Sequence, residues 1–107
     1  MADECVFCRI VNKEIKAEIV AETSSFIAFP DAHPRTKGHT LIIPRKHFVN
    51  VMELPVVYGA EFLEIVKLVA EKSIKEGAEG FNLETNCGEA AGQVVMHCHF
   101  HLVPRKR

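Results

Sequence analysis

The chain has 107 residues, of which 48% are hydrophobic and 25% charged, a balance that suits one globular domain with a small core. Its formal net charge is −1, so we expect no general electrostatic attraction to nucleic acid or to an anionic membrane. No run of about 18 apolar residues occurs, and the first ten residues contain two acids and no basic segment before an apolar run. These features predict a single domain over residues 1–107 that is soluble and cytoplasmic and that binds neither nucleic acid nor membrane.

Short strands are predicted in the first half of the chain. Residues 18–22 and 25–29 are rich in apolar and β-branched side chains and flank a polar Thr-Ser pair, which is typical of a hairpin. Residues 31–38 combine several turn-forming residues with a closing glycine and predict a loop. The β-branched run at 39–44 predicts another strand, which ends at Pro44 because proline has no N–H for a sheet ladder.

A helical period replaces the strand pattern from about Val56 to Glu76, and Gly77 is suited to end the helix. One side of this helix is lined by Phe62, Ile65, Val66, Val69 and Ser73. The apolar arc is wider than one face requires, which indicates a second buried face such as a dimer contact. Residues 80–86 and 94–103 predict two further strands joined by a glycine-containing loop. Several strands around one long helix indicate an α+β fold with a mostly antiparallel sheet.

Three histidines occur at alternate positions within residues 97–101. In a strand, alternate side chains share a face, so His97, His99 and His101 would point together into a cleft or into solvent. The opposite face would then be the core face and would hold Met96, Cys98, Phe100 and Leu102. Three solvated histidines are the simpler alternative, but lysine, glutamate and threonine are the more common way to keep a strand surface polar.

A single metal ion is a poor explanation for all three histidines. At about 3.3 Å per residue, the outer two Cα atoms of an extended strand would lie about 13 Å apart, whereas zinc holds imidazole nitrogens at about 2.0–2.1 Å. Histidine titrates near neutral pH and has two distinct ring nitrogens. A row of histidines therefore suits chemistry on a phosphate, in which one ring attacks and another stabilises charge or handles a proton.

The Cys5-x-x-Cys8 pair is a second candidate motif. In a reducing compartment such a pair indicates a metal site or a redox pair rather than a disulfide framework, and two unrelated thiols are a further alternative. A redox pair usually begins a helix in a βαβ context, which this N-terminus does not show. A zinc site would need two more ligands, and two neutral histidines are the ordinary complement.

The sequence HCHFHLV at 97–103, preceded by GQ at 92–93, resembles the signature of the histidine triad (HIT) superfamily of nucleotide hydrolases and transferases. Residues 5–20, 26–47 and 81–93 resemble the other blocks of that family in the same order. The resemblance implies a HIT-like antiparallel sheet of about five strands per subunit, with one long helix and a short N-terminal helix. It also implies a homodimer whose subunits join their sheets, with a nucleotide cleft on each subunit.

The family reaction is attack by a histidine on the α-phosphate of a nucleotide, release of the leaving group, and hydrolysis of the nucleotidyl-enzyme by water. By position, His99 matches the nucleophile, and its other ring nitrogen would donate to a backbone carbonyl near His97. His101 matches a residue that contacts the phosphate. His39 matches a fourth histidine that supports the triad from the neighbouring strand.

The resemblance also implies contacts along the rest of the nucleotide. Gln93 and Asn86 match phosphate-side contacts, since an amide can donate to an anionic oxygen without adding charge. Asp31 matches the acid that accepts from the ribose hydroxyls, although alone it could equally cap a turn. The residues that match or adjoin the apolar clamp around the base are Phe7, Ile10, Ile15, Phe29 and Leu41. Without the resemblance, plain core packing would explain each of these apolar residues.

Val94 departs from the family pattern, because many relatives carry serine or threonine immediately after the glutamine that Gln93 matches. A hydroxyl at this position can contact the leaving group, so that hydrogen bond would be missing here. Its absence favours groups that leave without much protonation. In the alternative interpretation, Val94 merely extends a strand and another residue or water substitutes.

One zinc-containing branch of the superfamily includes the Hint-type nucleoside phosphoramidate hydrolases and the related uridylyltransferases. There, a CxxC pair joins a histidine after a P-x-x-H turn and the first histidine of the triad. The resemblance implies a closed structural Zn²⁺ site of Cys5, Cys8, His47 and His97. It implies hydrolysis of purine nucleoside 5′-phosphoramidates or related conjugates; the alternatives are dinucleoside polyphosphate hydrolysis and a nucleotide-sensing or interaction module with little turnover.

Overall fold

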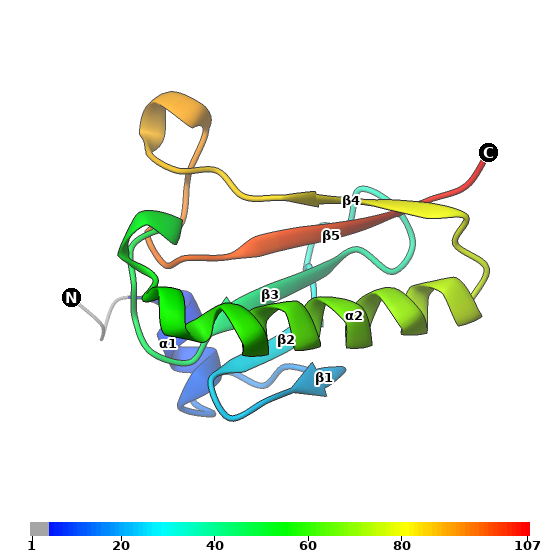
Figure 1. Ribbon diagram of the computed structural model, residues 1–107. Helices are drawn as coiled ribbons and strands as arrows, with labels where there is room; N and C mark the ends of the chain where they lie inside the picture. Colours follow the sequence, from blue (N-terminus) through cyan, green and yellow to red (C-terminus); the bar gives the residue numbers. More distant parts are fainter. Residues whose placement is uncertain (1–4) are drawn as a thin grey trace.

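The computed structural model describes residues 5–107, which fold around one five-stranded antiparallel sheet with the order β1-β2-β3-β5-β4 (Figure 1). The α+β expectation is confirmed. The strands are β1 (Ala21–Glu22), β2 (Phe26–Pro30), β3 (Thr40–Pro44), β4 (Gly80–Glu84) and β5 (Phe100–Arg105). The helices are α1 (Val6–Val11) and α2 (Gly59–Lys75), with 3₁₀ turns at Val51–Glu53, Val56–Tyr58 and Glu89–Ala91. None of these helices is long and apolar enough to cross a membrane.

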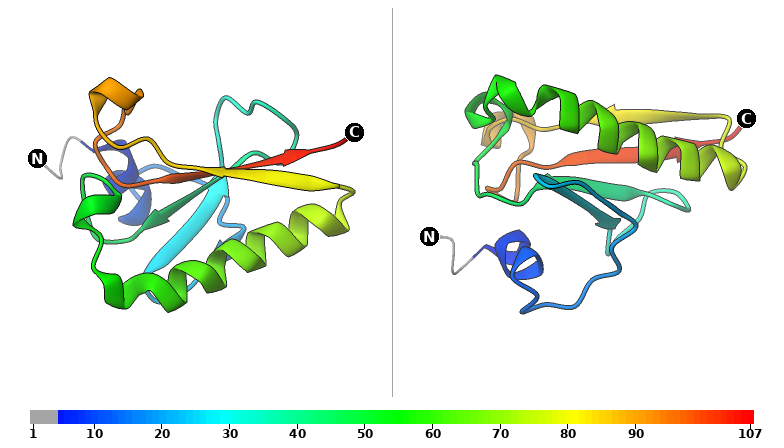
Figure 2. Two further views of the ribbon diagram at one scale, coloured as in Figure 1. Left: turned by 45° about the horizontal axis from the view of Figure 1, so that its top comes forward. Right: turned by 60° about the horizontal axis from the view of Figure 1, so that its bottom comes forward.

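The sheet separates two hydrophobic clusters. The long helix α2 runs along one face, and α1 lies on the opposite side (Figure 2). On the α2 side, Phe26 and Ile42 of the sheet pack with Ile65 of the helix. On the α1 side, Phe7 packs with Phe29. Both faces of β2 and β3 are therefore covered, which explains why these strands read as continuous apolar runs rather than as alternating ones.

The predicted helix is confirmed in type and differs at its start. Residues Val56–Tyr58 form a 3₁₀ turn, and the α-helix begins at Gly59. Its buried residues are Ile65, Val66, Val69, Ala70 and Ser73. At the other end, Gly77 has φ +104°, and its N–H donates to the carbonyl of Ile74 at 3.0 Å. This left-handed conformation, which a glycine adopts without strain, ends the helix as expected.

The prediction of a strand over 94–103 was wrong at its start, because β5 begins only at Phe100 and ends at Arg105. Residues before Phe100 are held off the sheet: the backbone N–H of Cys98 donates to the carbonyl of Phe48 at 2.6 Å, outside any strand. His97 is consequently buried with 0% exposure, and Met96 is 38% exposed instead of lying in the core. Of the residues expected on the core face, Cys98, Phe100 and Leu102 are buried, but His99 and Val103 between and after them are buried as well, so both faces of this segment are covered.

The strand register aligns one row of side chains across four strands. Phe29 of β2 lies opposite Leu41 of β3, Leu41 lies opposite His101 of β5, and His101 lies opposite Glu84 of β4. Directly opposed residues in a sheet project from the same face. The row is therefore apolar at the β2 end and polar at the β4 end, and it forms a floor on the side of the sheet that carries α1.

Candidate active site and metal centre

A cavity of about 940 Å³ lies above this floor. Among the residues expected at the site, those that line it are Phe7, Ile10, Ile15, Phe29, Asp31, Leu41, Asn86, Val94, His99 and His101. The side chains come from α1, from β2, β3 and β5, and from the loops around the sheet, so segments far apart in the sequence meet here. The cavity is large enough for a small-molecule ligand, for which pockets of about 300–1,000 Å³ are typical.

Aromatic side chains form the apolar end of the cavity. The ring of Phe7 packs edge-on against Phe29, with ring centroids 5.9 Å apart, and against His99, with centroids 5.1 Å apart. Phe7 and Phe29 are also buried members of one hydrophobic cluster. Phe7 and Phe29 therefore belong to the hydrophobic core and line the cavity at once. They place an apolar wall directly beside His99, the central histidine of the triad.

His99 is held in one orientation. Its Nδ1 lies 2.7 Å from the carbonyl oxygen of His97, and the hydroxyl of Thr85 donates to the carbonyl of His99 at 2.7 Å. A carbonyl oxygen can only accept, so Nδ1 of His99 carries the proton and Nε2 bears a free lone pair. The side chain is 9% exposed and lines the cavity. The arrangement is suited to nucleophilic attack by Nε2.

His101 and His39 form a pair beside Asp31. The Nε2 atom of His39 lies 3.0 Å from Nδ1 of His101 and 3.4 Å from a carboxylate oxygen of Asp31. Burial lowers the pKa of both imidazoles, an effect that the nearby carboxylate opposes. For His101, the neighbouring His99 and His39 lower the pKa further. Both rings are therefore held toward their neutral forms.

Asp31 caps a turn through one carboxylate oxygen and also lines the cavity. One carboxylate oxygen accepts from the backbone N–H of His33 at 2.8 Å, as expected for an aspartate that caps a turn. The other oxygen lies beside His39, and the residue lines the cavity. The cap and the site are thus compatible interpretations of one side chain.

Gln93 does not line the cavity, although it was expected at the phosphate. Its Nε2 donates to the carbonyls of Val49 at 2.6 Å and Val95 at 3.0 Å, and its Oε1 accepts from the N–H of Gly88 at 2.8 Å. These bonds use both amide donors and the amide oxygen. In this structure Gln93 braces the loop that follows β4, and Asn86 is the amide that lines the cavity.

Arg35 and Glu84 also line the cavity and were not anticipated from the sequence. The guanidinium of Arg35 donates to the two carboxylate oxygens of Glu84 at 3.1 and 3.5 Å. This hydrogen bonding holds the pKa of Glu84 below its usual range. The two residues are 49 positions apart, and Arg35 lies in the loop between β2 and β3, so no local sequence pattern indicates that it meets Glu84 beside His101.

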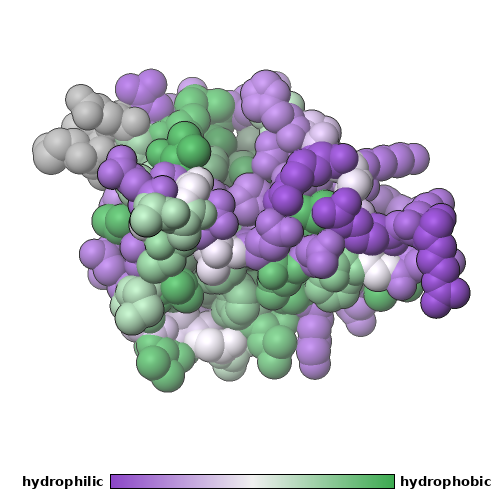
Figure 3. Space-filling view, turned by 90° about the horizontal axis from the view of Figure 1, so that it is seen from above, coloured by the Kyte–Doolittle hydropathy of each residue, from purple (hydrophilic) through white to green (hydrophobic). Residues whose placement is uncertain are grey.

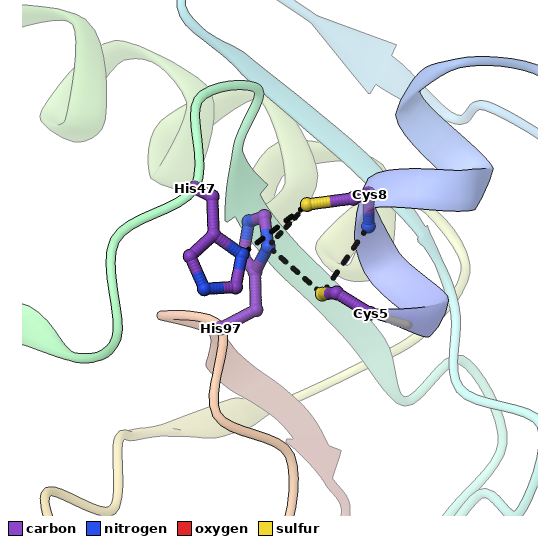
Figure 4. Close-up of side chains that lie close together, drawn as sticks. All are labelled: Cys5, Cys8, His47 and His97. Atoms are coloured by element: carbon purple, nitrogen blue, oxygen red, sulfur yellow. Dashed lines mark hydrogen bonds between the residues drawn. The ribbon is translucent and has the colours of Figure 1, made fainter. Parts of the chain in front are cut away.

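The four predicted metal ligands come together in one cluster (Figure 4). Nδ1 of His97 lies 3.3 Å from the sulfur of Cys5 and 3.5 Å from that of Cys8, whose sulfur is 3.2 Å from Nδ1 of His47. With Zn–S of about 2.3 Å and Zn–N of about 2.0 Å, sulfur and nitrogen ligands of a tetrahedral zinc ion stand about 3.5 Å apart. The observed separations are close to this value.

The chemistry of these donors also fits a cation. Nε2 of His97 donates to the carbonyl of Pro44 at 3.0 Å, which leaves Nδ1 bare toward the sulfurs. Burial lowers the pKa of His97 to about 4, so the ring is neutral, as a ligand must be. Burial, followed by the hydrogen bond and the charge of the adjacent Cys5, raises the pKa of Cys8 to about 11, and a cation bound between the two sulfurs would favour their thiolate forms. The group could therefore hold a metal ion.

Comparison with known proteins gives the family. The sequence model of the HIT domain matches residues 12–107. An uncharacterized HIT-like protein of Methanocaldococcus jannaschii is 45% identical over 101 residues, which cover 94% of this chain and 78% of the relative. The adenosine 5′-monophosphoramidase of Schizosaccharomyces pombe is 42% identical, with 94% of this chain and 74% of the relative covered. This chain belongs to the HIT domain family.

A solved structure supports the same assignment. The Zn-bound histidine triad family protein of Mycobacterium smegmatis superposes with a TM-score of 0.88 at 36% identity, and the match covers 99% of this chain and 78% of that one. The HIT fold is therefore shared along nearly the whole of the chain.

Proposed function

We propose that this chain is a nucleotide hydrolase that releases a nucleoside 5′-monophosphate from purine nucleoside 5′-phosphoramidates or related nucleotidyl conjugates. The observation that carries the proposal is His99, whose protonated Nδ1 is bound to the carbonyl of His97 while the ring lines the cavity. The named activity of the S. pombe relative supports the choice of substrate class.

The reaction follows from this arrangement. The base lies in the apolar end beside Phe7 and Phe29, and the ribose hydroxyls donate to Asp31. Nε2 of His99 attacks the α-phosphorus, the bond from phosphorus to the leaving group breaks, and that group takes up a proton from solvent. Water then attacks the phosphorus of the nucleotidyl-histidine and gives one proton back to solvent, the N–P bond breaks, and the monophosphate departs with His99 restored. His101 and Asn86 stabilise the charge on the phosphate oxygens during both steps.

We infer that Cys5, Cys8, His47 and His97 hold a structural Zn²⁺ ion. When bound, the ion supplies a rigid link between the N-terminal segment and the segment before β5, and all four of its positions are filled by protein. His97 would thereby keep its backbone carbonyl in place for the Nδ1 proton of His99. Because these thiols must be reduced to bind metal, the site also supports a cytoplasmic location.

The edge of the sheet supports a homodimer. Within residues 5–107, β4 is an edge strand paired with β5 alone, and its Phe81 and Leu83 are exposed. An unpaired edge with apolar side chains invites pairing with another strand. Figure 3, seen from above Figure 1, shows apolar residues among the hydrophilic ones on this side, and hydrophilic residues gather toward the end that carries the C-terminus. We infer that two copies join their sheets along β4.

A second candidate function is a nucleotide-sensing or interaction module with little turnover, and dinucleoside polyphosphate hydrolysis is a third. Val94 is the observation that favours them, because it lines the cavity with 87% exposure and offers no hydroxyl to a departing group. In the module, the same cavity would bind a nucleotide without cleaving it.

The test is release of AMP from adenosine 5′-monophosphoramidate by the native chain and by His99→Ala. We expect turnover in the native chain, a nucleotidyl group bonded to His99 in rapidly quenched samples, and neither in the variant. AMP binding to both proteins, measured by calorimetry, checks that the cavity survives the substitution. AMP binding without turnover on any nucleotidyl substrate would contradict the enzyme and establish the sensing module; turnover confined to dinucleoside polyphosphates would select the third candidate.

A further inference from the structure

We propose that Arg35 is a positioning residue that sets which nitrogen of His101 carries the proton, acting through His39, and that its ion pair with Glu84 holds it in place. The inference rests on the proposed function, because the ring whose proton is set is the one that would contact the α-phosphate. Neither Arg35 nor Glu84 belongs to the histidine motif or to the metal-binding group.

First, a backbone N–H determines which nitrogen of His39 carries the proton. The amide N–H of Arg35 donates to Nδ1 of His39 at 3.0 Å. A peptide N–H always carries its proton, so Nδ1 of His39 must present a lone pair. A neutral imidazole with a bare Nδ1 carries its proton on Nε2. Protonation of His39 at Nδ1 would break the bond to Arg35, and this ring is 2% exposed, so water does not readily replace the partner.

The second step passes the assignment to His101. The Nε2–H of His39 faces Nδ1 of His101 at 3.0 Å, so Nδ1 of His101 accepts and its proton resides on Nε2. The carboxylate of Asp31 lies 3.4 Å from the same Nε2 of His39 and competes only at longer range. His101 then presents an N–H donor rather than a lone pair, and a donor is what an anionic phosphate oxygen needs.

The same bond argues against a second metal site. One ligand atom each from Asp31, His39 and His101 lie within 4.8 Å of one another, as a two-histidine, one-carboxylate cation site would require. A metal on Nε2 of His39 would drive the proton to Nδ1, where the amide of Arg35 already donates. Two donors would then face each other. The cluster is therefore a chain of hydrogen bonds, in which each member polarises the next.

The side chain of Arg35 holds its amide at this position. Its guanidinium binds the carboxylate of Glu84, which lies directly opposite His101 in the β4–β5 register. The next residue, Thr36, donates through its hydroxyl to the carbonyl of Pro104 at 2.7 Å. The loop that carries Arg35 is thus attached to both strands on which Glu84 and His101 lie. Arg35, at one end of the hydrogen-bond chain, is therefore held by β4 and β5, and His101, at the other end, lies on β5.

Imidazole ¹⁵N NMR on the protein as purified tests the proton arrangement directly, since protonated and bare ring nitrogens have well-separated shifts. At neutral pH we expect His39 and His101 each to show a bare Nδ1 and a protonated Nε2. A proton on Nδ1 of either ring would overturn the inference. Because the measurement requires no substrate, its result is independent of whether the chain hydrolyses phosphoramidates.

Glu84→Gln then tests the ion pair, and Glu22→Gln is its matched control. Glu22 accepts from Arg45 at 2.8 Å in another arginine–glutamate pair, on β1 and away from the cavity. We expect Glu84→Gln to add a second set of His39 and His101 signals from the opposite tautomer, and Glu22→Gln to leave the native pattern. An unchanged pattern in Glu84→Gln would overturn the role of the pair, and a mixture in both variants would show a general loss of order and overturn it as well.

Discussion

The side chain and the backbone of His97 belong to two neighbouring clusters: its Nδ1 lies 3.3 Å from the sulfur of Cys5 in the candidate metal-binding group of Cys5, Cys8, His47 and His97, and its carbonyl accepts the Nδ1 proton of His99 at 2.7 Å. A displacement of His97 would therefore move the hydrogen-bond partner of the proposed nucleophile. The metal-binding group and the reacting ring are separated by only one residue of the chain.

Loss of the metal should consequently affect both stability and turnover. We expect about one zinc per native chain and close to none in Cys5→Ser/Cys8→Ser, together with a lower Tm. We also expect kcat to fall on the order of 10- to 100-fold, as is usual when the support of a reacting group is removed. Metal analysis, thermal unfolding and AMP release measure the three effects.

Cys87→Ser is the matched control for the metal variants, because Cys87 is an exposed thiol outside the four-residue group. It should retain zinc. Native protein that contains no zinc after purification under reducing conditions would contradict the metal assignment. Zinc loss with unchanged kcat would instead contradict the link through His97.

A hydroxyl at position 94 should donate a hydrogen bond to the departing atom and so speed the release of poor leaving groups. Val94→Thr preserves the side-chain shape and adds a donor at the cavity wall. One hydrogen bond to the departing atom contributes about 1 kcal/mol, so we expect a roughly fivefold increase in kcat/KM for a basic alkylamine leaving group. An aromatic amine, which leaves with less need of a proton, should gain little.

Val94→Ala separates the hydroxyl from changes in bulk at this position. Val94→Ala should change kcat/KM for the alkylamine and for the aromatic amine by the same factor. Equal gains for both amines in Val94→Thr, or the same selective gain in Val94→Ala, would contradict a role for the missing hydroxyl.

Glu61 should make folding sensitive to acid. Hydrogen bonds from Ser25, followed by those from Thr23 and Ser24, lower the pKa of Glu61 to about 2 from an ordinary value of 4.5. The folded state thus favours the carboxylate, so its stabilising contribution is complete above about pH 4.5 and is lost as the pH falls toward about 2. Glu61→Gln should be less stable at neutral pH and should lose less stability across this window.

Denaturant unfolding at a series of pH values measures this difference. Glu64→Gln, one turn along the exposed side of α2, is the matched control and should follow the native curve. Protonation of the metal ligands affects all three proteins alike and cancels in the comparison. Parallel curves for Glu61→Gln and the native chain would contradict the prediction.

The proposed dimer is testable at the exposed edge of the sheet. Leu83→Glu places a charge on β4, where strands of two copies would meet, and should convert a dimer into a monomer in analytical ultracentrifugation. Ile19→Glu is matched in exposure, since both side chains are 41% exposed, and should remain dimeric. A monomeric native chain, or dissociation by both variants, would contradict pairing along β4.

The histidine spacing and the CxxC pair marked two candidate motifs, and the resemblance to the HIT family predicted how they would be assembled. The apolar runs predicted β2 and β3, and the helical period predicted α2 to within a few residues. These signals are local, because each depends on side chains that repeat within one element. The family resemblance supplied the grouping of Cys5, Cys8, His47 and His97, which no local period indicates.

The remaining features depend on contacts across long sequence separations. A strand over 94–103 was expected because the pattern alternates, but the bond from Cys98 to Phe48 and the buried ring of His97 draw this segment away from the sheet. Gln93 was expected at the phosphate, and backbone partners such as Val49 and Gly88 instead occupy its amide. Arg35 and Glu84 carry no motif: the register of β4 and β5 places Glu84 beside His101, and the path of the loop between β2 and β3 brings Arg35 to it.

The row formed by Phe29, Leu41, His101 and Glu84 faces the cavity only when the strands pair in the observed register, so the site forms only in the correctly folded chain. If β5 paired one residue out of step, Leu102 would be exposed to the ligand and the His101 imidazole would be forced into the apolar interior. Such a misfolded chain would be unstable and inert at once. A catalytic assay on newly refolded protein is thus also a count of the molecules whose strands have paired correctly.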